Sequence, residues 1–254
     1  MHEDILIATD QIIEGARRRG LTVRLLGGTA IKMRCPSATH RSLSRKIPDI
    51  DLITLRRDAR KLSEMFVELG LEPMKMFNAL HGDKRMLFTD VKWERQVDVF
   101  VESFEMCHKF DFRDRLRLDD VTLPLADLLI TKLQIIQINE KDYKDILSLM
   151  MDHPLSEDDS DKEKINAAYI ASLCAKDWGI WRTLTRNLEW TRDFVRKLDM
   201  EPDKKDTVIS RINGLLARIE KEPKSVGWKM RSKLGERVIW YDEPEHVGKL
   251  AAHD

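Results

Sequence analysis

The sequence is short of cysteine, of long apolar runs and of net charge, and each shortage excludes a class of protein. Its 254 residues hold three cysteines, Cys35, Cys107 and Cys174. Their odd number and wide spacing argue against a disulfide framework or a zinc site and favour a reducing, cytoplasmic setting. No apolar run approaches the length of a membrane span, and no apolar segment of a signal peptide is evident near the N-terminus. We therefore expect neither a membrane protein nor a secreted one.

Positive and negative side chains are equally numerous, with 44 Lys and Arg against 44 Asp and Glu. A net charge of zero implies no overall attraction to nucleic acid, which leaves only local basic clusters to consider. Charged residues make up 35% of the chain and hydrophobic residues 42%, as is typical of a soluble globular protein. The length allows one large domain or two modest ones.

One stretch, residues 23–53, carries the strongest pattern, and its first part predicts a place for phosphate. Val23 to Leu26 reads as a buried strand that runs into Gly27-Gly28 and a short helix. Glycines let a ligand approach the backbone closely, and the start of a helix offers unpaired N–H groups to phosphate oxygens. Thr29 adds a hydroxyl at the same place.

The second part of this stretch, Pro48 to Ile53, predicts a strand with two aspartates on one face. Asp49 and Asp51 are two residues apart, and alternate side chains of a strand share a face. Adjacent carboxylates repel and raise each other's pKa, and a divalent cation such as Mg²⁺ or Mn²⁺ would relieve that repulsion. Asp98 lies in a later alternating segment, residues 94–101. If the two strands pair, three carboxylates converge.

Gly-Gly, Asp-x-Asp on a strand and a lone Asp on a later strand together resemble the nucleotidyltransferase superfamily of the polymerase-beta type. In that family the first two aspartates bind metal, and the third binds metal and helps to activate the incoming hydroxyl. The resemblance implies catalytic metal ligands at Asp49, Asp51 and Asp98. It also implies a cradle for nucleotide phosphates at Gly27, Gly28 and Thr29. The passage between the two motifs is longer than in compact members, and we expect its extra length, residues 35–45, to form a loop.

Each of these features also has a purely structural interpretation, because short motifs recur by chance. Asp49 and Asp51 could mark a surface-facing edge of the sheet, and Asp98 could be an ordinary exposed strand residue. The order of the features along the chain is what favours the functional interpretation.

The rest of the N-terminal part predicts a mixed sheet with helices against it, an α/β (α+β) arrangement. Apolar residues at helical spacing predict helices over residues 3–18 and 58–69. Short β-like runs joined by tight turns predict a meander, with strands at residues 73–77, 85–89 and 92–101. Further along, Arg113, Arg115 and Arg117 alternate as on one face of a strand. They could meet substrate phosphates or be the self-paired charges of an edge strand.

A lysine within an apolar stripe is the next candidate. Residues 125–138 predict a helix, and Lys132 falls among its apolar positions, where it must reach solvent or meet an anion. Another helix follows from Lys141, and in it Asp142 and Asp145 share a face. These aspartates could cap the helix start, or one of them could bond Lys132 or a substrate group.

With these residues the resemblance narrows to the AbiEii-type nucleotidyltransferases, the toxin components of some toxin–antitoxin systems. The shared order is Gly-Gly-Thr-Ala, Asp-Ile-Asp, a strand Asp, Leu-Pro-Leu-x-Asp-Leu with Thr-Lys-Leu, and Lys-Asp-x-x-Asp-Ile, within residues 20–150. The resemblance implies an active-site lysine at Lys132 and a nucleotide-binding segment at Lys141, Asp142 and Asp145. It also implies an NTP substrate and a possible antitoxin partner.

An acidic run that contains a proline, His153 to Asp161, predicts a domain boundary. We expect a nucleotidyltransferase-like catalytic domain over residues 1–152 and a helical C-terminal domain over residues 162–254. Apolar periodicity places helices of the second domain at residues 162–175, 178–198 and 203–220.

The prediction is therefore a cytoplasmic, metal-dependent nucleotidyltransferase, which moves a nucleoside monophosphate from an NTP such as ATP to a hydroxyl or phosphate acceptor. The acceptor stays open among RNA, protein and a small molecule. A cationic antibiotic of the aminoglycoside type would require an acidic cleft, to which residues 157–161 could contribute. The remaining alternative is a non-catalytic nucleotide-binding or interaction module that has kept the fold. The presence of all three aspartates argues against that alternative.

Overall fold

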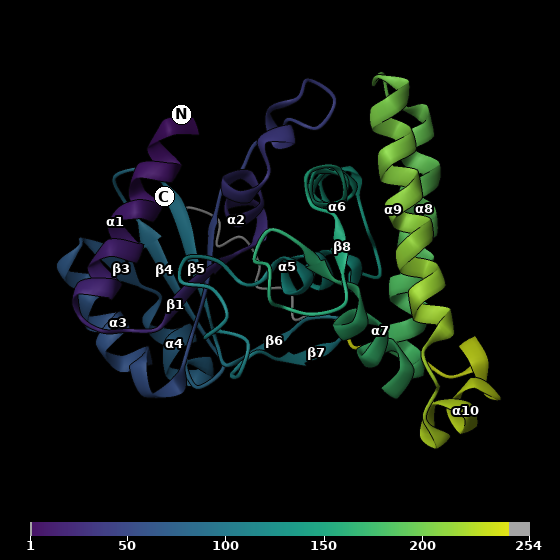
Figure 1. Cartoon of the computed structure of the whole chain (residues 1–254). Helices are drawn as coiled ribbons and strands as arrows, with labels where there is room; N and C mark the ends of the chain where they lie inside the picture. Colours follow the sequence, from purple (N-terminus) through teal and green to yellow (C-terminus); the bar gives the residue numbers. More distant parts are fainter. Residues whose placement is uncertain (1, 244–254) are drawn as a thin grey trace.

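The computed structural model describes residues 2–243, which form a mixed α/β fold with ten α-helices and one principal sheet (Figure 1). This confirms the predicted mixed α/β class. None of the helices in residues 2–243 combines the length and apolarity that crossing a membrane requires.

The principal sheet has five strands in the order β1-β2-β5-β4-β3. β2 and β5 run parallel, and every other neighbouring pair is antiparallel, so the sheet is mixed as expected. The strands are β1 Val23–Leu26, β2 Ile50–Thr54, β3 Leu71–Pro73, β4 Arg85–Asp90 and β5 Arg95–Val101. A small hairpin, β6 Ser103–Glu105 with β7 Lys109–Asp111, and a short pair, β8 Leu155–Ser156 with β9 Ile165–Asn166, complete the strands.

The central strands form where apolar, mostly β-branched residues alternate with other side chains. Ile50 and Leu52 on β2 and Val97 and Val99 on β5 are each at most 1% exposed. At the outer edge of β1, the backbone of Leu25 exchanges hydrogen bonds with residues 121 and 123, which covers that edge. The parallel pairing of β2 with β5 therefore lies in the buried interior of the sheet.

Helices from the N-terminal part of the chain pack against the sheet, and the later helices form a separate helical layer (Figure 1). α1 His2–Arg18 contacts β1 and α3 Arg56–Glu68, as the helical spacing predicted. α2 Gly27–Arg34 follows β1 directly and leads into a 3-10 turn, Pro36–Thr39. Two further helices pack against α2, namely α5 Leu125–Leu133 and α6 Glu140–Asp152.

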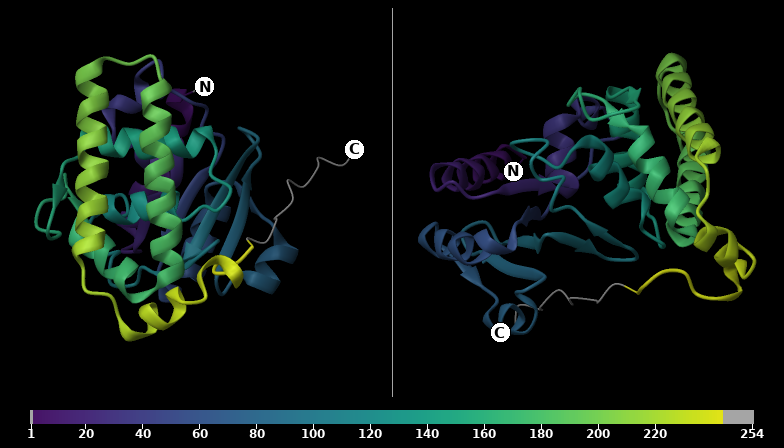
Figure 2. Two further views of the ribbon diagram at one scale, coloured as in Figure 1. Left: turned by 90° about the vertical axis from the view of Figure 1, so that its right-hand side faces the viewer. Right: turned by 60° about the horizontal axis from the view of Figure 1, so that its bottom comes forward.

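The C-terminal part is helical, as predicted. It comprises α7 Ala167–Lys176, α8 Trp178–Lys197, α9 Pro202–Lys221 and α10 Val226–Ser232. The long helices α8 and α9 lie side by side (Figure 2) and pack against α5, α6 and α7. One connected cluster of buried apolar side chains extends from Ile5 to Ile219, across the boundary proposed from the sequence. Residues 244–254 of the predicted second domain lie outside the described residues.

Two local predictions are wrong. Residues 73–77 do not form a strand: β3 ends at Pro73 and a helix, α4 Lys75–His81, follows. The side chain of Asn78, on α4, takes the place of a neighbouring strand beside Leu87 of β4. Its amide nitrogen donates to the carbonyl of Leu87 at 3.0 Å, and its Oδ1 accepts from the backbone N–H of Leu87 at 2.7 Å. A helix thus covers the part of β4 that β3 does not reach.

The alternating arginines at 113, 115 and 117 do not lie on a strand either, because β7 ends at Asp111 and a turn follows. Arg113 pairs with Asp111. Arg115 donates to Asp127 at 2.8 Å and to Asp159 at 2.6 Å, and its guanidinium lies 3.9 Å from the centre of the Tyr169 ring. Arg115 therefore joins the acidic run to α5 and α7.

Candidate functional site

The two strand aspartates lie directly opposite each other. In the parallel register of β2 and β5, Asp51 is the partner of Asp98. Partners in adjacent strands project from the same face of a sheet, so the two carboxylates point to the same side. Asp98 is 4% exposed, Asp51 is half-buried, and Asp49 is exposed just before β2 begins. Of the three aspartates expected to converge, the structure thus aligns Asp51 with Asp98, whereas Asp49 precedes β2 and does not lie on the strand that was predicted to carry it.

The surroundings of Asp51 and Asp98 raise the pKa of both carboxyl groups. Burial, with the neighbouring charge of Asp98 second, raises the pKa of Asp51 to about 7, although Lys132 opposes the shift. Burial also raises the pKa of Asp98, against the opposing effect of Arg85. Positive charge brought to this place would favour the ionised form of both carboxylates.

The Gly-Gly turn approaches the carboxylates so closely that no side chain fits. Gly27 has a φ of +66°, and a Cβ there would lie 1.9 Å from Oδ2 of Asp51. A Cβ on Gly28 would lie 2.1 Å from the guanidinium of Arg45. The Thr29 hydroxyl donates to the carbonyl of Asp49 at 3.2 Å and ties the turn to the start of β2. Gly27 is therefore favoured both by its left-handed φ and by the adjacent Asp51 carboxylate, whereas at Gly28 a side chain would displace only the end of the Arg45 side chain.

Lys132 meets the two aspartates of α6. Its Nζ lies 2.9 Å from Oδ2 of Asp145 and 3.5 Å from Oδ1 of Asp142. Burial alone would lower the pKa of Lys132, but the two carboxylates outweigh it and the pKa is raised. Of the two alternatives that the sequence left open, reaching solvent or meeting an anion, the structure shows the second.

Arg45 completes the cluster from the loop before β2. Its Nε and a terminal nitrogen donate to the two oxygens of Asp145 at 2.7 and 2.6 Å. Burial opposes the charge of both groups, yet the ion pairs raise the pKa of Arg45 and, together with Lys132, lower that of Asp145. Asp145 therefore fixes two cations, Arg45 beside Gly28 and Lys132, and both lie within electrostatic reach of Asp51.

Asp142 has both of the roles that the sequence left open. Besides contacting Lys132, it forms a capping box with Asn139 at the start of α6. The Lys141 side chain is exposed, and its backbone N–H donates to Asn139. Within the described contacts, Lys141 thus stands apart from the cluster to which the resemblance assigned it.

On the opposite side, Arg85 holds Asp98. Arg85, on β4, donates to both carboxylate oxygens of Asp98, with Nε at 2.9 and 3.1 Å from them. The same guanidinium lies 5.0 Å from the centre of the Phe100 ring. Arg85 therefore partly neutralises one of the two facing aspartates.

The donor set fits a hard divalent cation that is shared with substrate. No three His, Cys, Asp or Glu side chains among residues 2–243 are grouped as a complete metal site. Mg²⁺ commonly takes only one or two carboxylates and completes its shell with phosphate oxygens and water. Asp51 and Asp98, aligned in adjacent strands, match that requirement, and Asp49 is close enough to raise the pKa of Asp51.

The sequence alone did not identify Arg45 and Arg85. Arg45 lay in the loop expected between the motifs, and its partner, Asp145, is 100 residues away. Arg85 could have been found from the predicted hairpin, because the register that pairs Leu87 with Asp98 places Arg85, two residues away, on the same face.

Comparison of the sequence with models of known protein families gives no match, and comparison with curated proteins gives none either.

Proposed function

We propose that the protein is a metal-dependent nucleotidyltransferase, which transfers a nucleoside monophosphate from an NTP to a hydroxyl or phosphate acceptor and releases pyrophosphate. The observation that carries the proposal is the register of Asp51 with Asp98, combined with the Gly27 turn that closes on Asp51. Facing carboxylates beside an uncapped helix start combine ligands for a hard cation with donors for phosphate.

The residues around Asp51 and Asp98 would have different roles in the transfer. The backbone at the start of α2 would donate N–H groups to the triphosphate, and the Arg45 guanidinium, which fills the space beside Gly28, would lie next to those donors. Lys132 and Arg45 would offset its negative charge while Asp145 holds them in position. Mg²⁺, held by Asp51 and Asp98, would supply charge neutralisation for the attacking and leaving oxygens. Asp98, the most buried of the three aspartates, would take the proton of the acceptor hydroxyl.

The test is the binding of the four NTPs with Mg²⁺, measured by thermal shift. We expect at least one NTP to stabilise the wild type only when Mg²⁺ is present, because a ligand that binds the folded state raises the melting temperature. The double variant Asp49→Ala/Asp51→Ala should lose that shift. Asp206→Ala, which removes an exposed carboxylate from α9, is the matched control and should keep it.

The absence of any shift with all four NTPs at millimolar concentration would contradict the proposal and favour the non-catalytic module. An equal shift in the double variant would show that the nucleotide binds elsewhere.

An acidic cleft for a cationic antibiotic gains no support from the run at residues 157–161, because its carboxylates are engaged within the protein. Asp159 is held by Arg115 and Glu157 by Arg218. The role of a toxin and the antitoxin partner stay predictions of the sequence resemblance.

A further inference from the structure

A concentration of exposed apolar side chains distinguishes the C-terminal segment, residues 222–243, from the rest of the protein. Between residues 226 and 239, five large apolar side chains are 49–77% exposed, namely Val226, Met230, Leu234, Val238 and Ile239. The other exposed large apolar side chains among residues 2–243 are spread over residues 7–190. Large apolar side chains that gather at one place on a protein surface commonly mark an interaction site.

The C-terminal segment is held against the helical layer near both of its ends. The backbone N–H of Ser225 donates to the carbonyl of Ala175 at 2.9 Å. Near the other end, the indole nitrogen of Trp240 donates to the Thr183 hydroxyl at 3.1 Å. The exposed apolar side chains between these two contacts are therefore presented to solvent by an anchored piece of structure.

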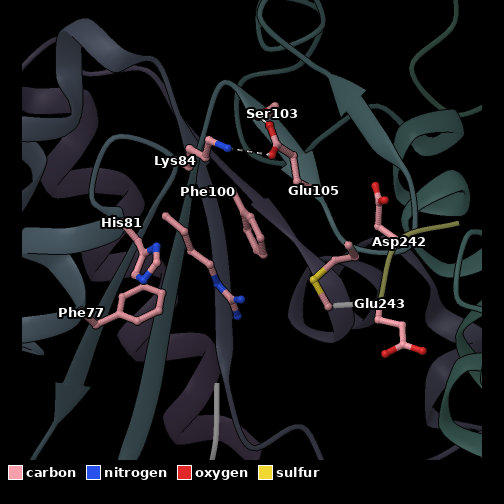
Figure 3. A pocket seen from close by; sticks show the side chains of 10 residues that line it. Phe77, His81, Lys84, Phe100, Ser103, Glu105, Asp242 and Glu243 are labelled. Atoms are coloured by element: carbon pink, nitrogen blue, oxygen red, sulfur yellow. Dashed lines mark hydrogen bonds and ion pairs between the residues drawn. The ribbon is translucent and has the colours of Figure 1, made fainter. Parts of the chain in front are cut away.

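The charge of the C-terminal segment differs between its end and its middle. Its end, Asp242 and Glu243, lies at the cleft drawn in Figure 3, where the backbone N–H of Asp242 donates to the carbonyl of Cys107 at 3.0 Å. Glu105 lines the same cleft, so that carboxylates gather there. The exposed apolar side chains belong to the middle of the segment, where the charge has the opposite sign.

Exposed cations accompany the apolar side chains in the middle of the segment. Lys229, Lys233 and Arg237 are exposed, and none of them forms an ion pair within residues 2–243. Between residues 221 and 238 the sequence has two carboxylates, Glu222 and Glu236, and these pair with arginines of α9 and α8. The middle of the segment therefore presents positive charge that the protein itself does not neutralise.

The cations and the apolar side chains share the outer face of α10. Residues four apart are neighbours on a helix, so Val226, Met230 and Leu234 form one row, and Lys229 and Lys233 lie beside it. The backbone stays helical through Leu234. The opposite face of α10 packs against α8, and the helix lies at a corner of the molecule, beyond the ends of α8 and α9 (Figure 1). The outer face thus interleaves aliphatic and cationic groups.

The aromatic rings of the C-terminal segment are packed against the helical layer. The Trp228 ring meets the edge of Trp181 at 5.2 Å between centres, and the Trp240 ring meets Trp178 in the same way at 5.9 Å. Binding of single-stranded nucleic acid relies on rings that are free to stack on bases. The outer face of α10 carries aliphatic side chains instead, so its composition does not suit a nucleobase.

The apolar row of α10 also projects from the surface instead of lining a groove. The hollow of about 230 Å³ beside α10 is lined by Trp178, Trp228 and Trp240, and it does not include the row. Side chains that are 50–75% exposed, as those of the row are, stand out from the surface. Recognition of a partner helix requires an apolar groove to receive it. The row is therefore better suited to entering another apolar phase than to receiving a protein segment.

An anionic bilayer surface matches a projecting face of this composition. At the boundary between headgroups and acyl chains, aliphatic side chains enter the apolar layer while Lys and Arg reach the phosphates on their flexible stems. Each cation near anionic lipid adds to the attraction, and attachment becomes stable when a basic patch is combined with an apolar insertion. Such attachment lies at the surface of a bilayer and needs no membrane-spanning helix.

We propose that the outer face of α10, formed by Val226, Met230 and Leu234 with Lys229 and Lys233, attaches the protein to bilayers that contain anionic phospholipid. The negative headgroups pair with the lysines, and the three aliphatic side chains enter the layer beneath them. The inference does not depend on the proposed nucleotidyltransferase reaction, because the residues of the candidate site all precede α7 and the test uses no nucleotide.

The test is flotation of the full chain with large unilamellar vesicles at about 1 mM lipid, well above the dissociation constant of a single myristoyl anchor. Vesicles of phosphatidylcholine alone are compared with vesicles in which about a third of the lipid is phosphatidylglycerol. Met230→Gln/Leu234→Gln removes the apolar row, and Lys229→Gln/Lys233→Gln removes two of the cations.

Each double variant has a matched control on another surface. Met76→Gln/Leu80→Gln removes two apolar side chains of α4 that have the same spacing and are 79% and 70% exposed. Lys61→Gln/Lys75→Gln removes two exposed lysines from α3 and α4 and changes the net charge by the same amount. These controls separate the outer face of α10 from general effects of apolarity and charge.

We expect the wild type to float with the anionic vesicles, to remain unbound with phosphatidylcholine alone, and to bind less at high salt. Met230→Gln/Leu234→Gln should lower the apparent association constant by at least about tenfold. Lys229→Gln/Lys233→Gln should lower it by about fivefold for each lysine removed. Both control variants should bind as the wild type does.

The inference is overturned if the wild type does not float with the anionic vesicles, which is the result expected of a face that instead binds a protein or RNA. Equal flotation with both kinds of vesicle would overturn it as well, as would equal binding by the α10 variants and their controls. Should Met230→Gln/Leu234→Gln not fold, as circular dichroism would reveal, Val226→Gln replaces it, with Met76→Gln as the control.

Discussion

The two flanks of the Asp51–Asp98 pair are built differently. On the Asp51 flank, Lys132 and Arg45 are both held by Asp145, a carboxylate that belongs to another helix and is not itself one of the facing pair. On the Asp98 flank, Arg85 bonds the facing carboxylate directly.

This difference separates a preorganised flank from one that must rearrange. The cations beside Asp51 are fixed before any ligand binds, which lowers the ordering cost of binding a triphosphate. Asp98 can ligate a metal or take a proton only if Arg85 shares or releases its oxygens. We therefore expect binding of the nucleotide with its metal to be accompanied by a movement of the Arg85 side chain.

The largest expected effect is the loss of transfer when either facing carboxylate becomes an amide. Because second-shell changes at metal sites already cost about 10–100-fold, removal of a direct ligand in Asp51→Asn or Asp98→Asn should reduce transfer by at least about 100-fold. The assay is incorporation from α-labelled NTPs, with Asp206→Asn as the control. If only one of the two variants lost activity, the pair would not share a metal.

The Asp51 flank can be tested through its glycine. Gly27→Ala places a Cβ against Asp51 at a φ of +66°, whereas Gly20→Ala meets nothing within 4 Å at a φ of +65°. Both variants should lose about 1–2 kcal/mol for the left-handed conformation, and Gly27→Ala should lose clearly more.

Urea unfolding of both variants measures that difference. Adding Asp51→Gly to Gly27→Ala should recover most of the excess loss, since it removes the atoms that the Cβ meets. Equal losses of unfolding free energy in Gly27→Ala and Gly20→Ala would mean that the turn at Gly27 is not in close contact with Asp51.

A direct comparison of the flanks uses their arginines. Arg85→Met leaves the buried Asp98 carboxylate without its guanidinium, which typically costs roughly 3–5 kcal/mol. Arg45→Met should cost less, because Asp145 keeps its ion pair with Lys132. Mg²⁺ should recover part of the stability of Arg85→Met, because the cation would bind at Asp98 in the place of the guanidinium. It should recover little in Arg45→Met, where Lys132 and Asp145 remain paired.

Thermal unfolding with and without about 10 mM Mg²⁺ tests this prediction. Ca²⁺ and Na⁺ at equal ionic strength control for screening. An identical response of the two variants to Mg²⁺ would contradict the proposed difference between the flanks.

The smallest expected effect is a dependence of stability on pH at Asp51. Its pKa is about 7 in the folded protein against an ordinary 3.8. Between these values the folded state keeps a proton that the unfolded state has lost, so the metal-free protein loses stability as pH rises through this range. Asp51→Asn removes that loss and should be more stable than the wild type at pH 8, with a smaller gain at pH 5.

Urea unfolding at both pH values, without metal, measures the gain. Asp206→Asn should differ from the wild type by the same small amount at pH 5 and pH 8. A gain for Asp51→Asn that did not grow with pH would mean that the carboxylate is already stabilised in its ionised form.

The sequence predicted the parts of the structure that local pattern controls. The strand at Val23–Leu26 and the mixed sheet follow from apolar periodicity. The contact of Lys132 with the α6 aspartates was one of the alternatives that the cost of burying a lysine alone left open. The helix at residues 75–81 was missed because its role is to cover β4, which only the assembled sheet defines.

The cations that distinguish the flanks could not be predicted in the same way. Arg45 reaches Asp145 across 100 residues, a contact that leaves no periodic signal near either residue. Lys141, in contrast, matched the motif by sequence, yet its side chain points to solvent. Motif order therefore located the carboxylates, whereas the placement of the charges around them required the three-dimensional structure.

The measurement that tests the account most directly is Mn²⁺ binding by electron paramagnetic resonance, in the presence of the NTP that gives the largest thermal shift. The wild type and Asp206→Asn should remove Mn²⁺ from solution when the NTP is present, and Asp51→Asn should not. Equal Mn²⁺ binding by Asp51→Asn and the wild type would contradict the claim that the facing aspartates of β2 and β5 hold the metal of a nucleotidyltransferase.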